Sequence, residues 1–214
     1  MIKIGIELNH VVRNINKQIL KYYQKDIDPT LDLDDIDEKD DVFKYAKFNS
    51  LDEKNDFIYI DYPYELYGCA KTMSKELPVL INNWLSELTN YEEDDVEISF
   101  FSLNEDSLTI QSSYFFLSKI GTRVRKIIFP KSIDEIRDEY DVVITGNKEV
   151  IEYFNNTNHN TYVIKVLNNV DKECKADKEY DSLDSVIKDE KLLETLQDFV
   201  NNKRNKNVAD GKTN

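Results

Sequence analysis

The sequence predicts an α/β fold: a doubly wound, Rossmann-like parallel sheet of about five strands, with a small cap-like insertion between strands 1 and 2. Five short runs of β-branched and other apolar residues occur along the chain, at 2–8, 96–101, 124–129, 141–145 and 161–167. Strands buried on both faces read as such continuous runs, and this burial is typical of parallel sheets. Helical patterns separate the runs, which indicates helices on both faces of the sheet.

The insertion is predicted to follow the first strand–helix unit. Apolar residues recur at helical spacing over 11–23, directly after the first strand. Nine acidic residues then fall within 26–41, and this composition favours a solvated loop. An aromatic stretch, 57–67, precedes a helical pattern over 71–90. We therefore expect residues 26–92 to form a cap-like insertion over the core.

The alternation of helices and strands resumes after the insertion. Helical patterns separate the later strands at 107–120, 133–139 and 148–154, and a final helix is predicted at about 183–203. Residues 1–25 and 93–203 are thus predicted to form the α/β core. The polar residues 204–214 are predicted to form a flexible tail.

Composition narrows the class of protein. The 214 residues are 40% hydrophobic, enough for one sizeable core, and their net charge of −14 argues against general nucleic-acid binding or attraction to anionic membranes. No stretch has the length and apolar character of a membrane span, and Cys69 and Cys174 form no CxxC pair, so we expect a soluble protein of the cytoplasm with ordinary thiols. Asn and Ile each occur 21 times and Gly only 5 times, a usage associated with AT-rich genomes such as those of some phages.

Four segments in order carry a resemblance to a known family. They are IKIGIELNHVVRNINKQILKYY, VEISFFS, SYFFLSKIG and DVVITGN. Their order resembles the haloacid-dehalogenase-like superfamily, particularly its nucleotidase-like branch. The resemblance implies a central first strand that ends in Asp-x-Asp, in which the first Asp attacks phosphorus and the second is a general acid and base. It also implies a Lys that stabilises charge and an acidic pair that helps to hold Mg²⁺.

The residues at these positions are unsuited to that chemistry. Glu7 replaces the nucleophile with a side chain one methylene longer, and such a displacement of about an ångström costs on the order of 100-fold in rate. Asn9 replaces the general acid and base and cannot transfer a proton at neutral pH. General acid–base catalysis typically contributes about 10² to 10⁴ in rate. Ser113 replaces the Lys and so lacks its fixed positive charge, and Lys119, one turn further on, is the alternative source of that charge.

The remaining positions lack metal ligands. Thr145 and Gly146 replace the acidic pair, which leaves Glu7 as the one obvious anionic ligand where Mg²⁺ needs several oxygens. Ser102 keeps the type that the resemblance implies. Because parallel strands share a carboxyl edge, we expect these residues to converge on one vestigial pocket without a metal: Glu7, Asn9, Ser102, Ser113, Thr145 and Gly146. The alternative is that Glu7 and Asn9 are ordinary polar loop residues of an unrelated α/β domain.

Other chemistry-bearing residues fit simpler interpretations. The acidic run lacks the Gly and the ligand spacing of an EF-hand, so we expect no calcium site there. His10 and His159 have no ligand partners at metal spacing, and the basic residues between 123 and 131 fit a solvated rim. The aromatic residues of the insertion are either its core or a protein interface. These interface candidates are Phe57, Tyr59, Tyr62, Tyr64, Tyr67 and Trp84.

Together the residues favour a non-catalytic protein without cofactors. We expect it to bind other protein chains in an oligomer or a larger assembly, for example the tail or connector region of a phage virion, because function lives in sites rather than in the fold. One alternative is a Mg²⁺-dependent phosphatase or 5'-nucleotidase with altered motifs. A third is a sensor that binds a nucleotide or phosphate without hydrolysing it.

Overall fold

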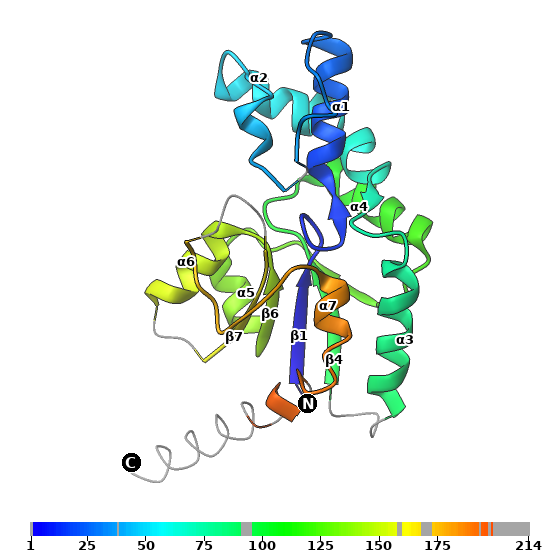
Figure 1. Cartoon of the computed structure of the whole chain (residues 1–214), viewed down its shortest axis with the longest axis vertical. Helices are drawn as coiled ribbons and strands as arrows, with labels where there is room; N and C mark the ends of the chain where they lie inside the picture. Colours follow the sequence, from blue (N-terminus) through cyan, green and yellow to red (C-terminus); the bar gives the residue numbers. More distant parts are fainter. Residues whose placement is uncertain are drawn as a thin grey trace.

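The computed structural model describes residues 2–37, 39–90, 96–157, 160–167, 173–192, 194–196 and 198. A six-stranded sheet forms its centre (Figure 1). The strands are β1 (Ile2–Glu7), β4 (Val96–Phe101), β5 (Lys126–Ile128), β6 (Val142–Thr145), β7 (Tyr162–Val166) and β8 (Lys178–Tyr180).

The sheet is parallel and doubly wound, as predicted. Its spatial order is β5-β4-β1-β6-β7-β8, and each of these five pairings is parallel. In chain order this is 3-2-1-4-5-6, the order of the Rossmann fold, so the switch point lies between β1 and β6. The first strand is inside the sheet, as expected, and the sheet has one strand more than the five predicted.

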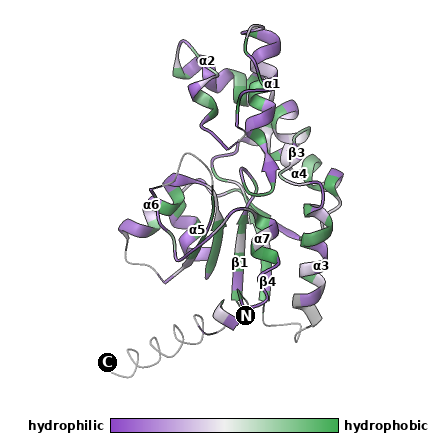
Figure 2. Cartoon of the chain, viewed as in Figure 1, coloured by the Kyte–Doolittle hydropathy of each residue, from purple (hydrophilic) through white to green (hydrophobic). Residues whose placement is uncertain are grey.

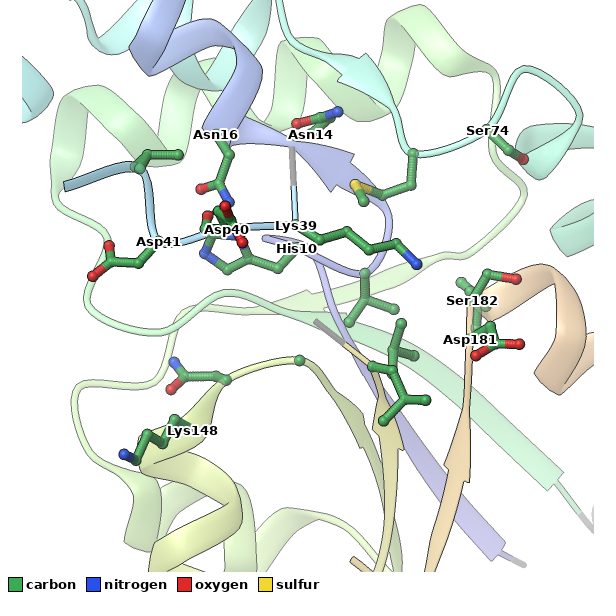
Figure 3. A pocket seen from close by; sticks show the side chains of 18 of the residues that line it. His10, Asn14, Asn16, Lys39, Asp40, Asp41, Ser74, Lys148, Asp181 and Ser182 are labelled. Atoms are coloured by element: carbon green, nitrogen blue, oxygen red, sulfur yellow. The ribbon is translucent and has the colours of Figure 1, made fainter. Parts of the chain in front are cut away.

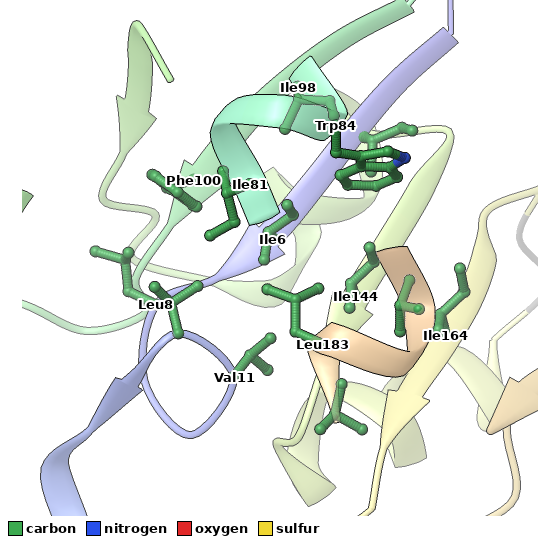
Figure 4. Packing of buried hydrophobic residues seen from close by; sticks show 14 of the residues in the cluster. Ile6, Leu8, Val11, Ile81, Trp84, Ile98, Phe100, Ile144, Ile164 and Leu183 are labelled. Atoms are coloured by element: carbon green, nitrogen blue, oxygen red, sulfur yellow. The ribbon is translucent and has the colours of Figure 1, made fainter. Parts of the chain in front are cut away.

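Two hydrophobic clusters cover the two faces of the sheet. The even positions of β1, such as Ile4 and Ile6, pack with helices α3 (Leu77–Asn90), α4 (Ser107–Ile120) and α7 (Leu183–Ile187) (Figures 1 and 4). The other cluster joins α5 (Ile133–Glu139) and α6 (Lys148–Asn156) to residues such as Val143. Alternation along a strand thus sends neighbouring residues to opposite layers. In Figure 2, β4 and β6 are largely hydrophobic.

Close packing on the α5 side requires glycine at position 5. A Cβ atom there would lie 2.7 Å from the ring of Tyr140, closer than carbon atoms can approach. The Tyr140 hydroxyl is fixed by a 2.8 Å hydrogen bond to Ser99 Oγ, so the ring has little freedom to move.

A second unit stands beyond the carboxyl edge of the sheet. It comprises α1 (Ile15–Asp26), η1 (Val42–Lys44), α2 (Leu51–Asn55) and two π-helical segments, η2 (Asp56–Asp61) and η3 (Tyr64–Gly68). A short antiparallel pair, β2 (Arg13–Asn14) and β3 (Lys71–Thr72), lies between this unit and the core (Figure 1).

Both boundaries of the insertion differ from the predicted ones, as the packing of α1 and α3 shows. The apolar face of α1 is buried against Val42, Phe57 and Leu66 of the insertion, so α1 belongs with the insertion rather than with the core. Helix α3 packs on the sheet through Leu77 and Trp84, so it belongs with the core rather than with residues 26–92.

Three helices differ from their predicted ranges. The first begins at Ile15 rather than at 11, because Asn14 caps it by accepting from the Lys17 amide. The second begins at Leu77 rather than at 71, because residues 71–72 form β3 and Pro78 fits a first helical turn. The third, predicted at 183–203, is interrupted after Ile187, and residues 192, 194–196 and 198 are helical again.

The early end of α7 has a local cause. Asp189 accepts hydrogen bonds from Lys178 Nζ and Tyr180 Oη of β8, at 2.6 and 2.5 Å, and from the Lys191 amide at 3.0 Å. These contacts hold the chain in a turn directly after the helix. The part of the predicted helix beyond 198 and the predicted tail, 204–214, lie outside the described residues. Within the described part of the chain, no helix is long and apolar enough to span a membrane.

Candidate functional site

The carboxyl end of β1 places Glu7 beside β6. The register pairs Ile6 with Ile144, so the next residues, Glu7 and Thr145, are neighbours on the same face. Thr145 Oγ1 donates to Glu7 Oε2 at 2.5 Å, and the Gly146 amide donates to the same oxygen at 3.2 Å. Only 2% of Glu7 is exposed. The carboxyl group is therefore held by its own chain.

Burial also changes the ionisation of Glu7. Loss of hydration raises the pKa of Glu7 to about 7, although hydrogen bonds from Thr145, Gly146 and Asn147 act in the opposite direction. Near neutral pH this carboxyl group is thus protonated in a large fraction of molecules. A protonated carboxyl is a poor nucleophile and a poor metal ligand.

The remaining predicted residues form a second group around Arg13. Asn9 lies beyond the end of β1, and its Nδ2 donates to Ser102 Oγ at 3.3 Å. Its Oδ1 accepts from Arg13 Nε at 3.0 Å and from Nη2 at 2.6 Å. The amide oxygen of Asn9 is therefore occupied by a guanidinium group of the same chain.

Arg13 is completely buried and pairs with a buried carboxylate. Its Nη2 lies 2.8 Å from Glu105 Oε1, and its Nη1 donates to Ser113 Oγ at 2.7 Å and to the Tyr67 carbonyl at 3.1 Å. Ser113 in turn donates to Glu105 at 2.7 Å. Burial lowers the pKa of Arg13, while Glu105 raises it. The ring of Phe116 lies 5.4 Å from the guanidinium carbon, within the range of a cation–π contact.

The six residues of the predicted pocket thus form two closed hydrogen-bonded groups. Glu7, Thr145 and Gly146 form one, and Asn9, Ser102 and Ser113 are joined in the other through Arg13 and Glu105. Sequence reasoning missed Arg13 and Glu105. The one available signal was that Arg13 interrupts an apolar run. Its partner, Glu105, is 92 residues away, so no local sequence pattern connects the two.

A separate open cleft of about 640 Å³ lies between the strand ends and the insertion (Figure 3). Of the six predicted pocket residues, Gly146 alone lines it. His10 also lines it, with a left-handed backbone (φ 66°) that is uncommon for a residue other than glycine. Burial, with the nearby charge of Arg13, lowers the pKa of His10 to about 4, so its imidazole is neutral at pH 7. Among the described residues, no three His, Cys, Asp or Glu side chains are grouped to hold a metal ion.

The six aromatic interface candidates differ in how far their side chains are buried. Phe57, Tyr67 and Trp84 are buried in the hydrophobic clusters, so they are core residues and the prediction of an interface role for them is wrong. Tyr64 is 47% exposed. Tyr59 and Tyr62 are partly buried against the insertion core. Phe57 and Tyr67 pack because the insertion needs large apolar side chains to close a small core, whereas Trp84 of α3 packs on the sheet.

Two basic residues of the predicted rim have partners on the protein itself. Lys126 pairs with Glu97 at 3.1 Å and also contacts Glu139, and Lys131 donates to the Glu105 carbonyl. The two cysteines are free thiols of intermediate exposure. His159 lies outside the described residues.

No family model matches the chain, and no curated protein matches it. A solved structure described as a haloacid dehalogenase-like hydrolase from Burkholderia xenovorans LB400 is similar, at 9% identity and a TM-score of 0.47. The alignment covers 88% of this chain and 96% of that one. This similarity concerns the fold alone.

Proposed function

We propose that the chain is a non-catalytic α/β protein that acts by binding other protein chains. The observation that carries the proposal is the position of Arg13. Its guanidinium makes five hydrogen bonds to four residues of its own chain and occupies the space among Asn9, Ser113 and Glu105. A group sealed in this way is a structural element, since its polar atoms are already paired.

The state of Glu7 supports the absence of catalysis. A nucleophile must come within about 3–3.5 Å of the atom that it attacks, in line with its orbitals. Glu7 is buried, and one of its oxygens accepts from both Thr145 and Gly146. To reach a substrate it would have to break these bonds and leave its packed position.

An exposed apolar patch supports binding to other chains. It lies where η3 meets α4 and includes a groove of about 300 Å³ lined by Pro63, Tyr64, Leu108 and Phe115 among others. Tyr64, Leu108 and Phe115 are 47, 47 and 43% exposed. Large aromatic side chains supply much of the binding energy in protein interfaces, and such patches on soluble proteins often mark contact sites.

The finer part of the proposal concerns the assembly. We propose a phage particle, with the chain made in the host cytoplasm and then incorporated, and the support for this is the composition of the sequence. A net charge of −14 would keep free copies apart before assembly.

Co-expression with the products of neighbouring genes tests the proposal. Size-exclusion chromatography and cross-linking should show a complex, and Tyr64→Ala with Leu108→Ala should weaken it. The matched control is Leu51→Ala with Val79→Ala, two exposed apolar residues outside the patch. A chain that remains monomeric with every neighbour would contradict the proposal. Glu7-dependent hydrolysis of a nucleoside monophosphate would favour the phosphatase alternative instead.

A further inference from the structure

The cleft beside the sealed residues has the size and place of a ligand site. Its volume of about 640 Å³ falls in the range of roughly 300–1,000 Å³ that is usual for small-molecule pockets. It lies beyond the ends of β1 and β6, where His10, Gly146 and Asn147 line it, and this is the switch point of the sheet. Residues 39–43 and Tyr59 of the insertion form the opposite wall.

The charges around the cleft favour a cation. Two lysines line it, Lys39 and Lys148, and the imidazole of His10 is neutral at pH 7. Five carboxylates line it, which leaves an excess of three negative charges: Asp40, Asp41, Glu149, Asp181 and Asp184. Apolar side chains such as Val11 and Leu77 form part of the wall.

Two backbone amides beside the cleft already have partners within the chain. The N-terminus of α6 is capped by Asn147 Oδ1, which accepts from the Glu149 amide at 2.9 Å. The Gly146 amide donates to Glu7, as described above. Glu149 also places a negative charge in the first turn of α6. A phosphate group would therefore find these two amides occupied and would meet an excess of negative charge.

One residue of the chain already places an ammonium group in the cleft. Figure 3 shows the Lys39 side chain extended across it, from the insertion toward the side of Asp181 and Ser182. No ion pair of Lys39 with another described residue is seen within 4 Å. Lys39 thus occupies space that an external cation would need.

We propose that this cleft binds an organic cation: an ammonium or guanidinium group on an apolar stem. The carboxylates would hold the charged head, and the apolar wall would hold the stem. Two sources carry this chemistry, a Lys or Arg side chain of a partner protein and a free polyamine. The inference goes beyond the proposed function, which names no ligand.

Calorimetric titration of the full chain tests the inference, with spermidine and a short oligolysine peptide as cation probes and AMP and inorganic phosphate as anion probes. We expect at least one cation probe to bind, more weakly at higher salt. Asp41→Asn with Asp181→Asn should weaken that binding by about fivefold per charge, since a charge pair near 4 Å in water is worth about 1 kcal/mol. The amide oxygen introduced at position 41 can still accept from the Phe43 amide, as the Asp41 carboxylate does, so the fold should tolerate the change.

Two further variants distinguish an effect of charge on cation affinity from an effect of a destabilised fold. Glu87→Gln with Glu194→Gln removes the same charge from exposed positions outside the cleft lining and should change affinity less than twofold. Lys39→Gln should strengthen cation binding severalfold, a gain that a destabilised fold would not produce. Preference for spermidine over the peptide would identify a free polyamine, and the reverse would identify a partner side chain.

The inference is overturned if neither cation probe binds, if the anions bind instead, or if the Asp41/Asp181 variant leaves cation affinity unchanged. These outcomes are distinct from failure of the proposed function. That function is contradicted by turnover or by the absence of any protein complex, neither of which depends on cation affinity.

Discussion

Replacing Arg13 with methionine should destabilise the protein strongly. Methionine fills much of the same volume but removes all five hydrogen bonds of the guanidinium. It also leaves the Glu105 carboxylate buried without its cation. Breaking a buried ion pair in this way costs about 3–5 kcal/mol. A typical folding free energy is about 5–15 kcal/mol, so the loss would be a large fraction of the total.

Urea and thermal unfolding, each followed by circular dichroism, measure this loss directly. For a chain of this size, each kcal/mol corresponds to about 2–4 °C in Tm, so we expect a fall of roughly 6–20 °C. Arg137→Met is the matched control, because Arg137 pairs with Asp134 and Asp138 at the surface and should cost about 0.5 kcal/mol or less.

A double variant isolates the ion pair itself. Arg13→Met with Glu105→Gln removes the uncompensated charge, so it should regain more than half of the lost stability. If Arg13→Met costs less than about 1 kcal/mol, the guanidinium is not a central structural element of the fold. No recovery in the double variant would likewise refute the role of the unpaired carboxylate.

Three further predictions concern Glu7, the core and the glycine of β1. Burial raises the pKa of Glu7 from 4.5 to about 7. Between these two pH values, the folded chain therefore keeps a proton on Glu7 that the unfolded chain releases. Stability should therefore fall as pH rises from about 4.5 through 7, by up to about 3 kcal/mol, and Glu7→Gln should remove most of this slope in urea titrations at several pH values. Trp84→Ala should cost about 3–5 kcal/mol because it opens a cavity in the core, whereas Tyr64→Ala should cost about 0.5 kcal/mol or less; equal costs would contradict their different burial. Gly5→Ala should cost about 1–3 kcal/mol by thermal unfolding, because the new Cβ meets the ring of Tyr140, and Tyr140→Leu in the same chain should recover part of the loss.

The sequence contained most of the information needed for the sheet. Strands such as β1 and β6 are largely buried on both faces, so most of their residues are apolar and the strands could be recognised without the structure. Strand β8 could not be recognised, because its three residues, Lys178–Tyr180, are polar or half-buried at the edge of the sheet. The helical pattern that continues past Ile187 also gave no sign that Asp189 binds β8 instead.

The candidate site was predictable only in part. Glu7 and Thr145 could be expected to meet, because parallel strands end at a common edge and their register follows from the buried faces. The pairing of Arg13 with Glu105 depends on the turn after β1 and on the loop before α4. Neither local propensity nor periodicity encodes such a contact. The exposed position of Tyr64 beside the buried Tyr67 likewise depends on the π-helical turn that separates them.

Turnover of a phosphate ester with Mg²⁺ tests most directly whether the chain has lost catalysis. The full chain at high concentration should release no more phosphate from p-nitrophenyl phosphate or from nucleoside monophosphates than buffer alone, and Glu7→Gln should give the same result. Turnover near 1 s⁻¹, roughly the low end for enzymes, that Glu7→Gln abolishes would contradict this, because it would require the buried carboxyl group to reach a substrate.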